Sequence, residues 1–241
     1  MDGFELFCKG HVAILFIYPF FAAALVWLAV KLPAKASDIL IKICSIELLV
    51  CEALQDIQLT YEGGDFMGYL PLHLCNLGIF VNLLASFGKG RVREFFAEVS
   101  MTLIAPGSVF ALVTPEWNYR PLFSWLPLMC FFTHMLLGAL PLMMYARGYF
   151  KPSFRHFYYS YVFLIGAAVP IYIFDRITRC NYMFLLRAPS DTPLSWLESF
   201  MGNPGYLLGA CGILAVVLIV IYTAFFLTGK LITKLKAPAA V

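Results

Sequence analysis

Long hydrophobic stretches separated by short polar turns run through the whole chain. Crossing the hydrocarbon layer of a membrane takes about 20 apolar residues in a helix. Seven stretches meet or approach that length, and they cover residues 11–30, 39–59, 69–87, 95–113, 122–145, 157–174 and 206–227. The pattern predicts an all-α polytopic membrane protein, a seven-transmembrane-helix bundle that forms a single domain over residues 1–241.

The segment between the sixth and seventh stretches carries a helix signal of its own. Thr192 followed by Pro193 is typical of an N-cap residue and a first helical position. Trp196, Leu197 and Phe200 then recur at helical spacing. We expect a short amphipathic helix over about residues 193–201, lying in the membrane interface.

The composition agrees with a membrane protein and leaves no room for a large soluble domain. Hydrophobic residues make up 61% of the chain and charged residues only 13%, unlike ordinary soluble domains. The net charge of +3 comes from short turns, so we expect no nucleic-acid partner. A charged start leads directly into the first long stretch, so we expect no cleavable signal peptide. The seven cysteines include no Cys-x-x-Cys pair and predict no disulfide framework.

The charged turns alternate along the chain and predict its orientation. The turns after the first, third and fifth stretches, together with the C-terminal tail, hold 11 of the 17 Lys and Arg residues. Positively charged turns stay in the cytoplasm. We therefore expect the N-terminus outside and the C-terminus in the cytoplasm of a plasma-membrane protein. Arg176, Arg179 and Arg187 are exceptions, because they fall in a loop on the outer side.

The third stretch carries three groups that can do chemistry, namely His73, Cys75 and Asn76. Polar side chains at membrane depth are costly, and they usually face the interior of a bundle and serve function. A thiol near a histidine can also act as a nucleophile with its base in covalent catalysis. The alternative is that His73 and Asn76 only tie helices together through hydrogen bonds.

Further polar groups converge on the outer half of the predicted bundle. Glu52 and Asp56 lie four residues apart near the outer end of the second stretch, so they share a helix face. Asn181 and Tyr182 begin the long outer loop, and His134 lies in the middle of the fifth stretch. By contrast, Glu98 lies near the basic turns, and we expect it to be a paired charge.

Helix geometry restricts the partner of Cys75. On a regular helix His73 and Cys75 would point about 200° apart, so His73 is a poor base for the thiol unless Pro71 distorts this turn. His134 is then the candidate base, and the alternative is a core histidine bonded to nearby backbone. His-x-Cys on a helix cannot chelate a metal ion, and zinc sites usually show tighter spacing. We expect no metal site and no cofactor.

The run Leu70-Pro71-Leu72-His73-Leu74-Cys75 resembles the signature of YwaF-type bacterial membrane proteins, relatives of the eukaryotic transmembrane protein 164. The resemblance extends in order over about residues 69 to 208. It includes the segments Thr114-Pro115, Phe131-Phe132-Thr133-His134, Asn181-Tyr182-Met183-Phe184-Leu185, Arg187-Ala188-Pro189 and Pro204-Gly205-Tyr206-Leu207-Leu208. Asn76 stands where many bacterial relatives have an acidic residue.

The resemblance implies a phospholipid acyltransferase that works through a cysteine and binds membrane lipids. By this resemblance Cys75 is the nucleophile and His134 the essential histidine. A thiolate at Cys75 would attack a lipid ester and form a thioester, which a lysolipid hydroxyl or water would then resolve. His73 and Asn76 would donate hydrogen bonds to the oxyanion. Glu52 or Asp56 would orient a histidine.

A transporter or proton-coupled solute-binding protein is the main alternative function. Glu52, Asp56 and His134 are of the residue types that form proton relays through a membrane. A purely structural role of the polar cluster is a third possibility. The alternatives differ in one observable, because only the enzyme needs the sulfur of Cys75.

Overall fold

The structure is a computed structural model that describes residues 3–190 and 192–236, and this part of the chain contains helices and no strand. The long elements are α1 (Lys9–Lys31), α2 (Ala34–Tyr61), α3 (Leu74–Phe87), α4 (Gly90–Val99), α5 (Ala105–Val113), α6 (Trp125–Ala146), α7 (Tyr158–Thr178) and α9 (Gly205–Lys236). The short elements are the 3-10 turns η1 (Phe66–Gly68), η3 (Glu116–Tyr119), η4 (Phe154–His156) and η5 (Tyr182–Phe184), the π-helical η2 (Ser100–Ile104), and α8 (Pro193–Met201).

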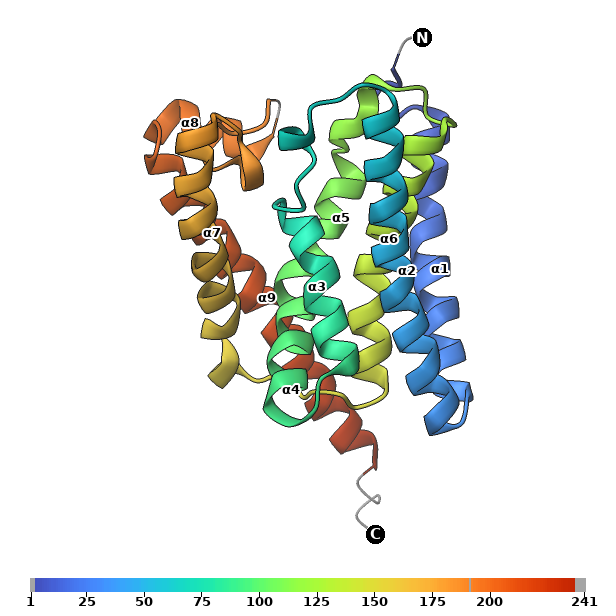
Figure 1. The fold of residues 1–241 in the computed structure, drawn as a ribbon. Coiled ribbons are helices and arrows are strands. Elements are labelled where there is room, and N and C mark those ends of the chain that lie inside the picture. Colours follow the sequence, from blue (N-terminus) through green and yellow to red (C-terminus); the bar gives the residue numbers. More distant parts are fainter. Residues whose placement is uncertain (1–2, 191, 237–241) are drawn as a thin grey trace.

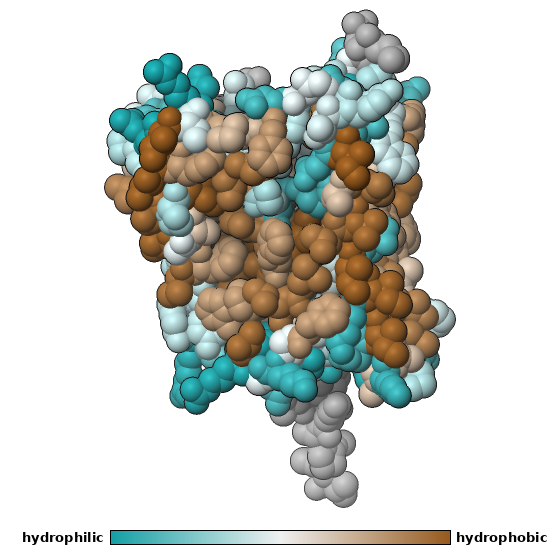
Figure 2. Space-filling model, viewed as in Figure 1, coloured by the Kyte–Doolittle hydropathy of each residue, from teal (hydrophilic) through white to brown (hydrophobic). Residues whose placement is uncertain are grey.

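The surface has the character of a membrane protein. Figure 2 shows a broad hydrophobic band across the middle of the face in view, with hydrophilic residues gathered at both ends. Five described helical segments are long and apolar enough to cross a membrane, namely Lys9–Lys31, Gly90–Tyr119, Trp125–Ala146, Phe154–Thr178 and Gly205–Thr228. The helix α2 carries charged residues along its length, and α3 has only 14 residues. The expected count of seven crossings and their direction therefore stay predictions.

The helix α6 is the centre of one group of helices. It packs against α1, α2, α3 and α5, and most of its residues from Leu126 to Met144 are buried. In Figure 1, α7 and α9 stand apart from this group at the end that carries α8, and they approach it near α4 and η2. Figure 1 also places the turns after α1, α3 and α6 at the opposite end from α8. The basic turns therefore share one end of the molecule.

Hydrogen bonds between small polar side chains connect the helices in the core. Ser100 donates to the amide oxygen of Asn82 over 2.9 Å, and the hydroxyls of Thr102 and Ser160 are 2.8 Å apart. Such interhelical bonds are common in membrane proteins, where apolar contact alone does not drive helices together. The pairs join η2 to α3 and to α7.

Glu98 is a paired charge, as its sequence position predicts. Its side chain is fully buried, and its carboxylate lies 2.6 Å from Nδ1 of His156. It also accepts hydrogen bonds from the hydroxyl of Tyr222, over 2.8 Å, and from the backbone of Ser153, over 3.2 Å. A buried carboxylate needs partners of this kind, so Glu98 links α4 to α9 and to the turn before α7.

The helix that we expected to begin near Tyr69 begins instead at Leu74. The segment before it is irregular, because Pro71 disfavours the helical conformation of the preceding residue. The hydroxyl of Tyr182 accepts from the backbone of Leu70 over 3.0 Å and donates to the backbone of Met67 over 2.6 Å. Figure 1 shows this segment descending from the α8 end to the start of α3, about halfway along the bundle.

Candidate functional site

A cavity of about 540 Å³ lies where α3, α5 and α6 face α7, α9 and the segment around η5. Its size is in the range of about 300–1,000 Å³ that is typical of ligand pockets. Apolar side chains such as Ile79, Leu137 and Leu164 form much of its wall. Its polar lining residues are Glu52, Gln55, His73, Cys75, Asn76, Ser108, Thr114, Glu116, Trp117, Cys130, Thr133, His134, Thr192, Tyr206 and Cys211.

Cys75 lies in the first turn of α3, two residues after the N-cap residue His73. The first N–H groups of a helix have no partner inside the helix. In the part of the chain that the structure describes, no oxygen accepts from the backbone N–H of Leu74, Cys75 or Asn76; the first bond of this helix is from Leu77 to the His73 carbonyl. These N–H groups and the positive end of the helix dipole favour negative charge at this place.

This position of His73 corrects the expected geometry of the pair. The expected angle of about 200° holds only if both residues lie on one regular helix, and Pro71 was the one residue expected to disturb it. His73 instead has an extended backbone, with φ −70° and ψ 156°, and stands outside the helix. Since Pro71 delays the helix start, the angular argument against His73 does not apply. The roles of the two histidines must be assigned from their hydrogen bonds.

Asn76 connects Cys75 to Glu52. The thiol of Cys75 donates to the amide oxygen of Asn76 over 3.6 Å, and the amide nitrogen of Asn76 donates to the carboxylate of Glu52. One of the two N–H groups of the Asn76 amide is therefore bonded to Glu52. The arrangement differs from the oxyanion donor that we expected, because Asn76 stands between a thiol and a carboxylate.

His134 is held in one tautomer by the backbone. Its Nδ1 lies 2.7 Å from the carbonyl oxygen of Cys130, one turn earlier in α6. A carbonyl can only accept, so Nδ1 carries the proton and Nε2 keeps a free lone pair. The ring packs against Trp117, with 4.8 Å between ring centroids. His134 thus offers the cavity wall an imidazole whose free nitrogen is a proton acceptor.

His73 is held in the opposite tautomer. Its Nδ1 accepts from the backbone N–H of Met183 over 3.4 Å, so the proton of the neutral ring is on Nε2. The ring packs edge-on against Tyr182 and also contacts Phe184, with centroid distances of 5.0 and 5.5 Å. His73 is therefore a hydrogen-bond donor through Nε2.

A second thiol lines the same cavity. Cys130 donates to the amide oxygen of Gln55 over 2.9 Å, and the amide nitrogen of Gln55 donates to Thr133 over 3.3 Å. Unlike Cys75, this thiol lies within a regular helix whose backbone N–H groups are bonded in the helix. Cys130 is therefore a natural comparison for Cys75 in the same surroundings.

The predicted site residues divide into two groups. Cys75, His134, His73, Asn76 and Glu52 all line the cavity, although they come from α2, α3, α6 and the segment before α3. The other three, Asp56, Asn181 and Tyr182, do not line it.

Each of those three residues has a different position. Asp56 shares the outer part of α2 with Glu52 but lies outside the cavity wall. The amide of Asn181 holds the loop backbone at residues 186 and 187, with bonds of 2.9 to 3.0 Å. Tyr182 packs behind His73 and fixes the segment before α3. Burial raises the pKa of Tyr182 to about 12, so its phenol remains a donor.

Sequence reasoning missed several lining residues, among them Glu116 and Trp117, which form the start of η3. These two follow directly after Thr114-Pro115, a segment already singled out by the resemblance, so their place in the chain was a usable signal. Glu116 adds a second carboxylate to the cavity, and Trp117 covers the ring of His134.

The described residues contain no group of three or more His, Cys, Asp or Glu side chains that is arranged to hold a metal ion. The side chains that line the cavity include a thiol at a helix N-terminus, one imidazole that accepts a proton, one that donates a hydrogen bond, and two carboxylates.

Comparison with known proteins adds one finding. The model of the TMEM164 family matches residues 6–222 of the chain. That range contains every polar residue of the cavity wall. No curated protein and no solved structure matches the chain.

Proposed function

Because the chain belongs to the TMEM164 family, a family of membrane proteins, we propose that it is a lipid acyltransferase or transacylase embedded in the membrane. In this proposal Cys75 is the nucleophile, His134 is the general base, and the acyl group passes through a thioester on Cys75. Glu52 acts through Asn76, and His73 donates to the oxyanion.

The observation that carries the proposal is the position of Cys75 within its cavity. The thiol stands in the first turn of α3, where unbonded backbone N–H groups gather, and His134 lines the same cavity. Burial alone works against ionisation of a thiol, whereas a helix N-terminus and a neighbouring base work in its favour. None of the other cysteines that line the cavity, Cys130 and Cys211, has such a position.

Irregular backbone at membrane depth gives further support. Such backbone is tolerated within a membrane only where protein buries it or where it lines a cavity. The segment before α3 descends into the bundle and ends at His73, which lines the cavity. The backbone just before Cys75 is therefore not helical, and it lacks the hydrogen bonds that a regular helix would form there.

In the first half-reaction Cys75 gives its proton to Nε2 of His134, directly or through one water molecule. The sulfur then attacks the carbonyl carbon of a phospholipid ester and forms a tetrahedral oxyanion. The Nε2–H of His73 and the free N–H groups of α3 stabilise this charge. When the intermediate collapses, the carbon–oxygen bond breaks. The departing lysolipid oxygen takes the proton from His134, and the acyl group remains on sulfur as a thioester.

In the second half-reaction a lysolipid hydroxyl gives its proton to His134 and attacks the thioester carbonyl. The carbon–sulfur bond breaks, and the Cys75 thiolate takes the proton back from His134. Water in place of the lysolipid would give hydrolysis by the same steps. The apolar wall suits a fatty acyl chain and limits the access of water to the thioester.

The transporter is the weaker alternative. Of the three groups suggested for a proton relay, Glu52 and His134 line the cavity but Asp56 does not. The Glu52 carboxylate is also bonded to Asn76. These contacts favour a role of Glu52 beside Cys75 over a role in a continuous relay.

The proposal includes seven membrane crossings, with α2 and α3 added to the five long apolar segments. Charged residues in α2 are acceptable when they face other helices or a cavity, as Glu52 does. The basic turns at the end opposite α8 favour a cytoplasmic position for that end of the plasma-membrane protein. The cavity then opens towards the outer half of the bilayer.

The test is to trap the acyl group on the protein. Purified protein supplied with phospholipid should gain a fatty-acyl mass on the peptide that contains Cys75, and hydroxylamine should remove it. The adduct should be absent from Cys75→Ala. Cys130→Ala is the matched control, because it removes a thiol from the same cavity and should leave the adduct in place. Adduct on Cys130 alone, or full lipid remodelling by Cys75→Ala, contradicts the proposal.

A further inference from the structure

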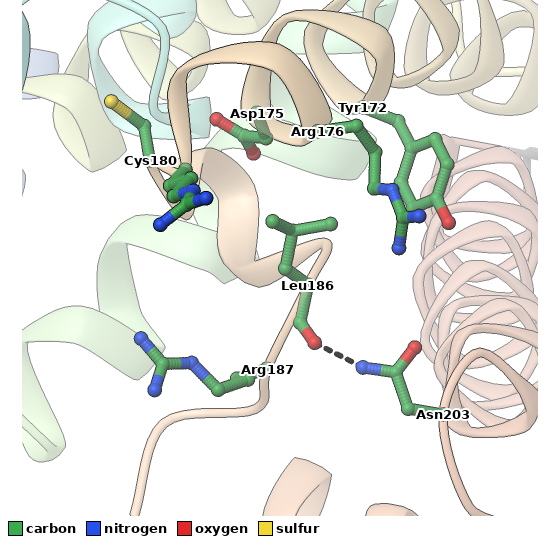
Figure 3. A pocket seen from close by; sticks show the side chains of 8 residues that line it. Tyr172, Asp175, Arg176, Cys180, Leu186, Arg187 and Asn203 are labelled. Carbon is green, nitrogen blue, oxygen red and sulfur yellow. Dashed lines mark hydrogen bonds between the residues drawn. The ribbon is translucent and has the colours of Figure 1, made fainter.

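A second cavity, also of about 540 Å³, lies beside the first at the end of the molecule that carries α8. Figure 3 shows the side chains that line it, which come from the last turns of α7, from the loop before α8 and from the turn before α9. Three of them are arginines, Arg176, Arg179 and Arg187. These are the residues whose charge does not fit the alternating pattern of the turns.

The three guanidinium groups have no partner within the described residues. None of them forms an ion pair or a side-chain hydrogen bond there. Asp175 belongs to the same wall, but its carboxylate is fully buried, and neither oxygen has a hydrogen-bond partner among the described residues. Three arginines and one aspartate give the lining a net charge of +2. Such a cavity is complementary to an anion with one or two negative charges.

The backbone conformation of Arg179 is a second, independent feature that is typical of ligand-binding sites. This residue caps α7 in the left-handed conformation, with φ 64°. Glycine is the usual residue at such a helix end, and other side chains adopt the conformation at a cost. The chain therefore keeps a guanidinium at a position that local stability alone would give to glycine. Backbone strain of this kind gathers at ligand-binding places.

The two cavities share one wall. Met183, Phe184 and Leu185 line the first cavity, and Leu186 and Arg187 line the second. The amide of Asn203 donates to the backbone of Leu186 and holds this wall in place, as the dashed line in Figure 3 shows. A molecule at the arginines is thus close to the segment that closes the proposed acyl site.

We propose that the arginine cavity binds the phosphate group of a phospholipid or lysophospholipid. Arginine is well suited to this task, since its planar guanidinium donates paired hydrogen bonds to phosphate oxygens. The choice of a lipid as the source of the phosphate rests on the proposed function. The site lies at one end of the apolar band, where the head groups of a membrane are found.

The experiment measures binding without catalysis, in full-length Cys75→Ala protein. The probes are a lysophospholipid, a monoacylglycerol with the same chain but no phosphate, and inorganic phosphate as a competitor. Binding is read by native mass spectrometry. The variant is Arg176→Gln/Arg179→Gly/Arg187→Gln, in which all three changed side chains are exposed and glycine relieves the strain at Arg179.

Loss of the phosphate contacts should weaken lysophospholipid binding at least about tenfold, since hydrogen bonds to charged groups contribute that much or more. Binding of the monoacylglycerol should change less than about twofold, which also shows that the variant is folded. The matched control is Arg91→Gln/Lys151→Gln/Arg155→Gln, which removes three exposed cations from the opposite end and should bind both lipids as before.

Three results overturn the proposal. The first is equal weakening by the control variant, which would mean a general charge effect. The second is unchanged lysophospholipid binding in the arginine variant. The third is displacement of the lysophospholipid by inorganic phosphate at a concentration no higher than the dissociation constant of the lipid, which would identify a soluble phosphate as the ligand. Since Cys75 is absent throughout, none of these results depends on whether an acyl-thioester forms.

Discussion

Nδ1 of His134 donates a hydrogen bond to the carbonyl oxygen of Cys130, with 2.7 Å between the two atoms. This single contact decides what the imidazole can do, because it leaves the lone pair of Nε2 free. His73 has the opposite arrangement, since its Nδ1 accepts from Met183. The two histidines of one cavity are therefore a proton acceptor and a hydrogen-bond donor. In the proposed acyl transfer these two roles are complementary.

His134→Asn separates the two tasks of His134. The asparagine amide nitrogen takes a place near Nδ1 and can keep the bond to Cys130, but it has no basic nitrogen. If His134 is the base, we expect acyl-thioester formation on Cys75 to slow by about 10²- to 10⁴-fold with little change in thermal stability. Stopped-flow or quench measurements of the adduct give the rate. A purely structural His134 predicts near-normal rates in this variant and loss only in His134→Ala.

His73 should make stability depend on pH. Its Nδ1 accepts a hydrogen bond from the backbone N–H of Met183, and only an unprotonated nitrogen can accept. The imidazole of the unfolded chain takes up a proton below a pH of about 6.5, so the stability that this bond contributes is present above that pH and is lost as pH falls below it. The melting temperature of the wild type should therefore fall between pH 8 and pH 5 by more than that of His73→Asn. Identical pH profiles of the two proteins would show that this bond does not form.

The contact between Asn76 and Glu52 should appear as a coupling energy. Asn76→Ala leaves the Glu52 carboxylate without its hydrogen-bond donor, and Glu52→Ala leaves the amide without its acceptor. We expect the double variant to be less destabilised than the sum of the singles, by about 0.5–2 kcal/mol. Unfolding in detergent gives the free energies. Glu52→Ala combined with the exposed Thr60→Ala is the control, and it should be additive.

The orientation can be tested by labelling with an impermeant maleimide. Single cysteines are placed in a cysteine-free variant at Tyr61 and Tyr119, which are exposed near the α8 end, and at Arg91 and Lys151 near the basic turns. In intact cells the first two should react and the last two should not, because positive turns stay in the cytoplasm. The reverse pattern would place the opening of the cavity in the cytoplasmic half of the bilayer.

Membrane helices could be predicted from the sequence because hydrocarbon imposes a local rule. Every backbone group must be bonded within its own helix, so an apolar run of sufficient length forms a helix whatever surrounds it. The structure has helices in all seven predicted ranges, with five long apolar segments among them. Short α8 has a local signal too, because Thr192 caps it and accepts from the backbone of Ser195 over 3.4 Å.

The site was predictable in its members but not in its contacts. Cys75, His134, His73, Asn76 and Glu52 are expensive at membrane depth, and this cost marks them in the sequence; all five line the cavity. The same rule also selected Asn181, although its amide only holds the loop at residues 186 and 187. Polarity shows that a residue needs partners, and it does not say which partners the fold supplies.

What the sequence by itself determined is the class of protein, the places of its helices and the set of costly polar residues, all of which follow from local composition and spacing. The start of α3 and the tautomer of His73 were decided only by the tertiary structure, whereas the tautomer of His134 follows from a contact one turn away in α6. The reason is distance along the chain: Tyr182 holds Leu70, and Met183 holds His73, across more than 100 residues. Contacts of that kind exist only once the helices have packed.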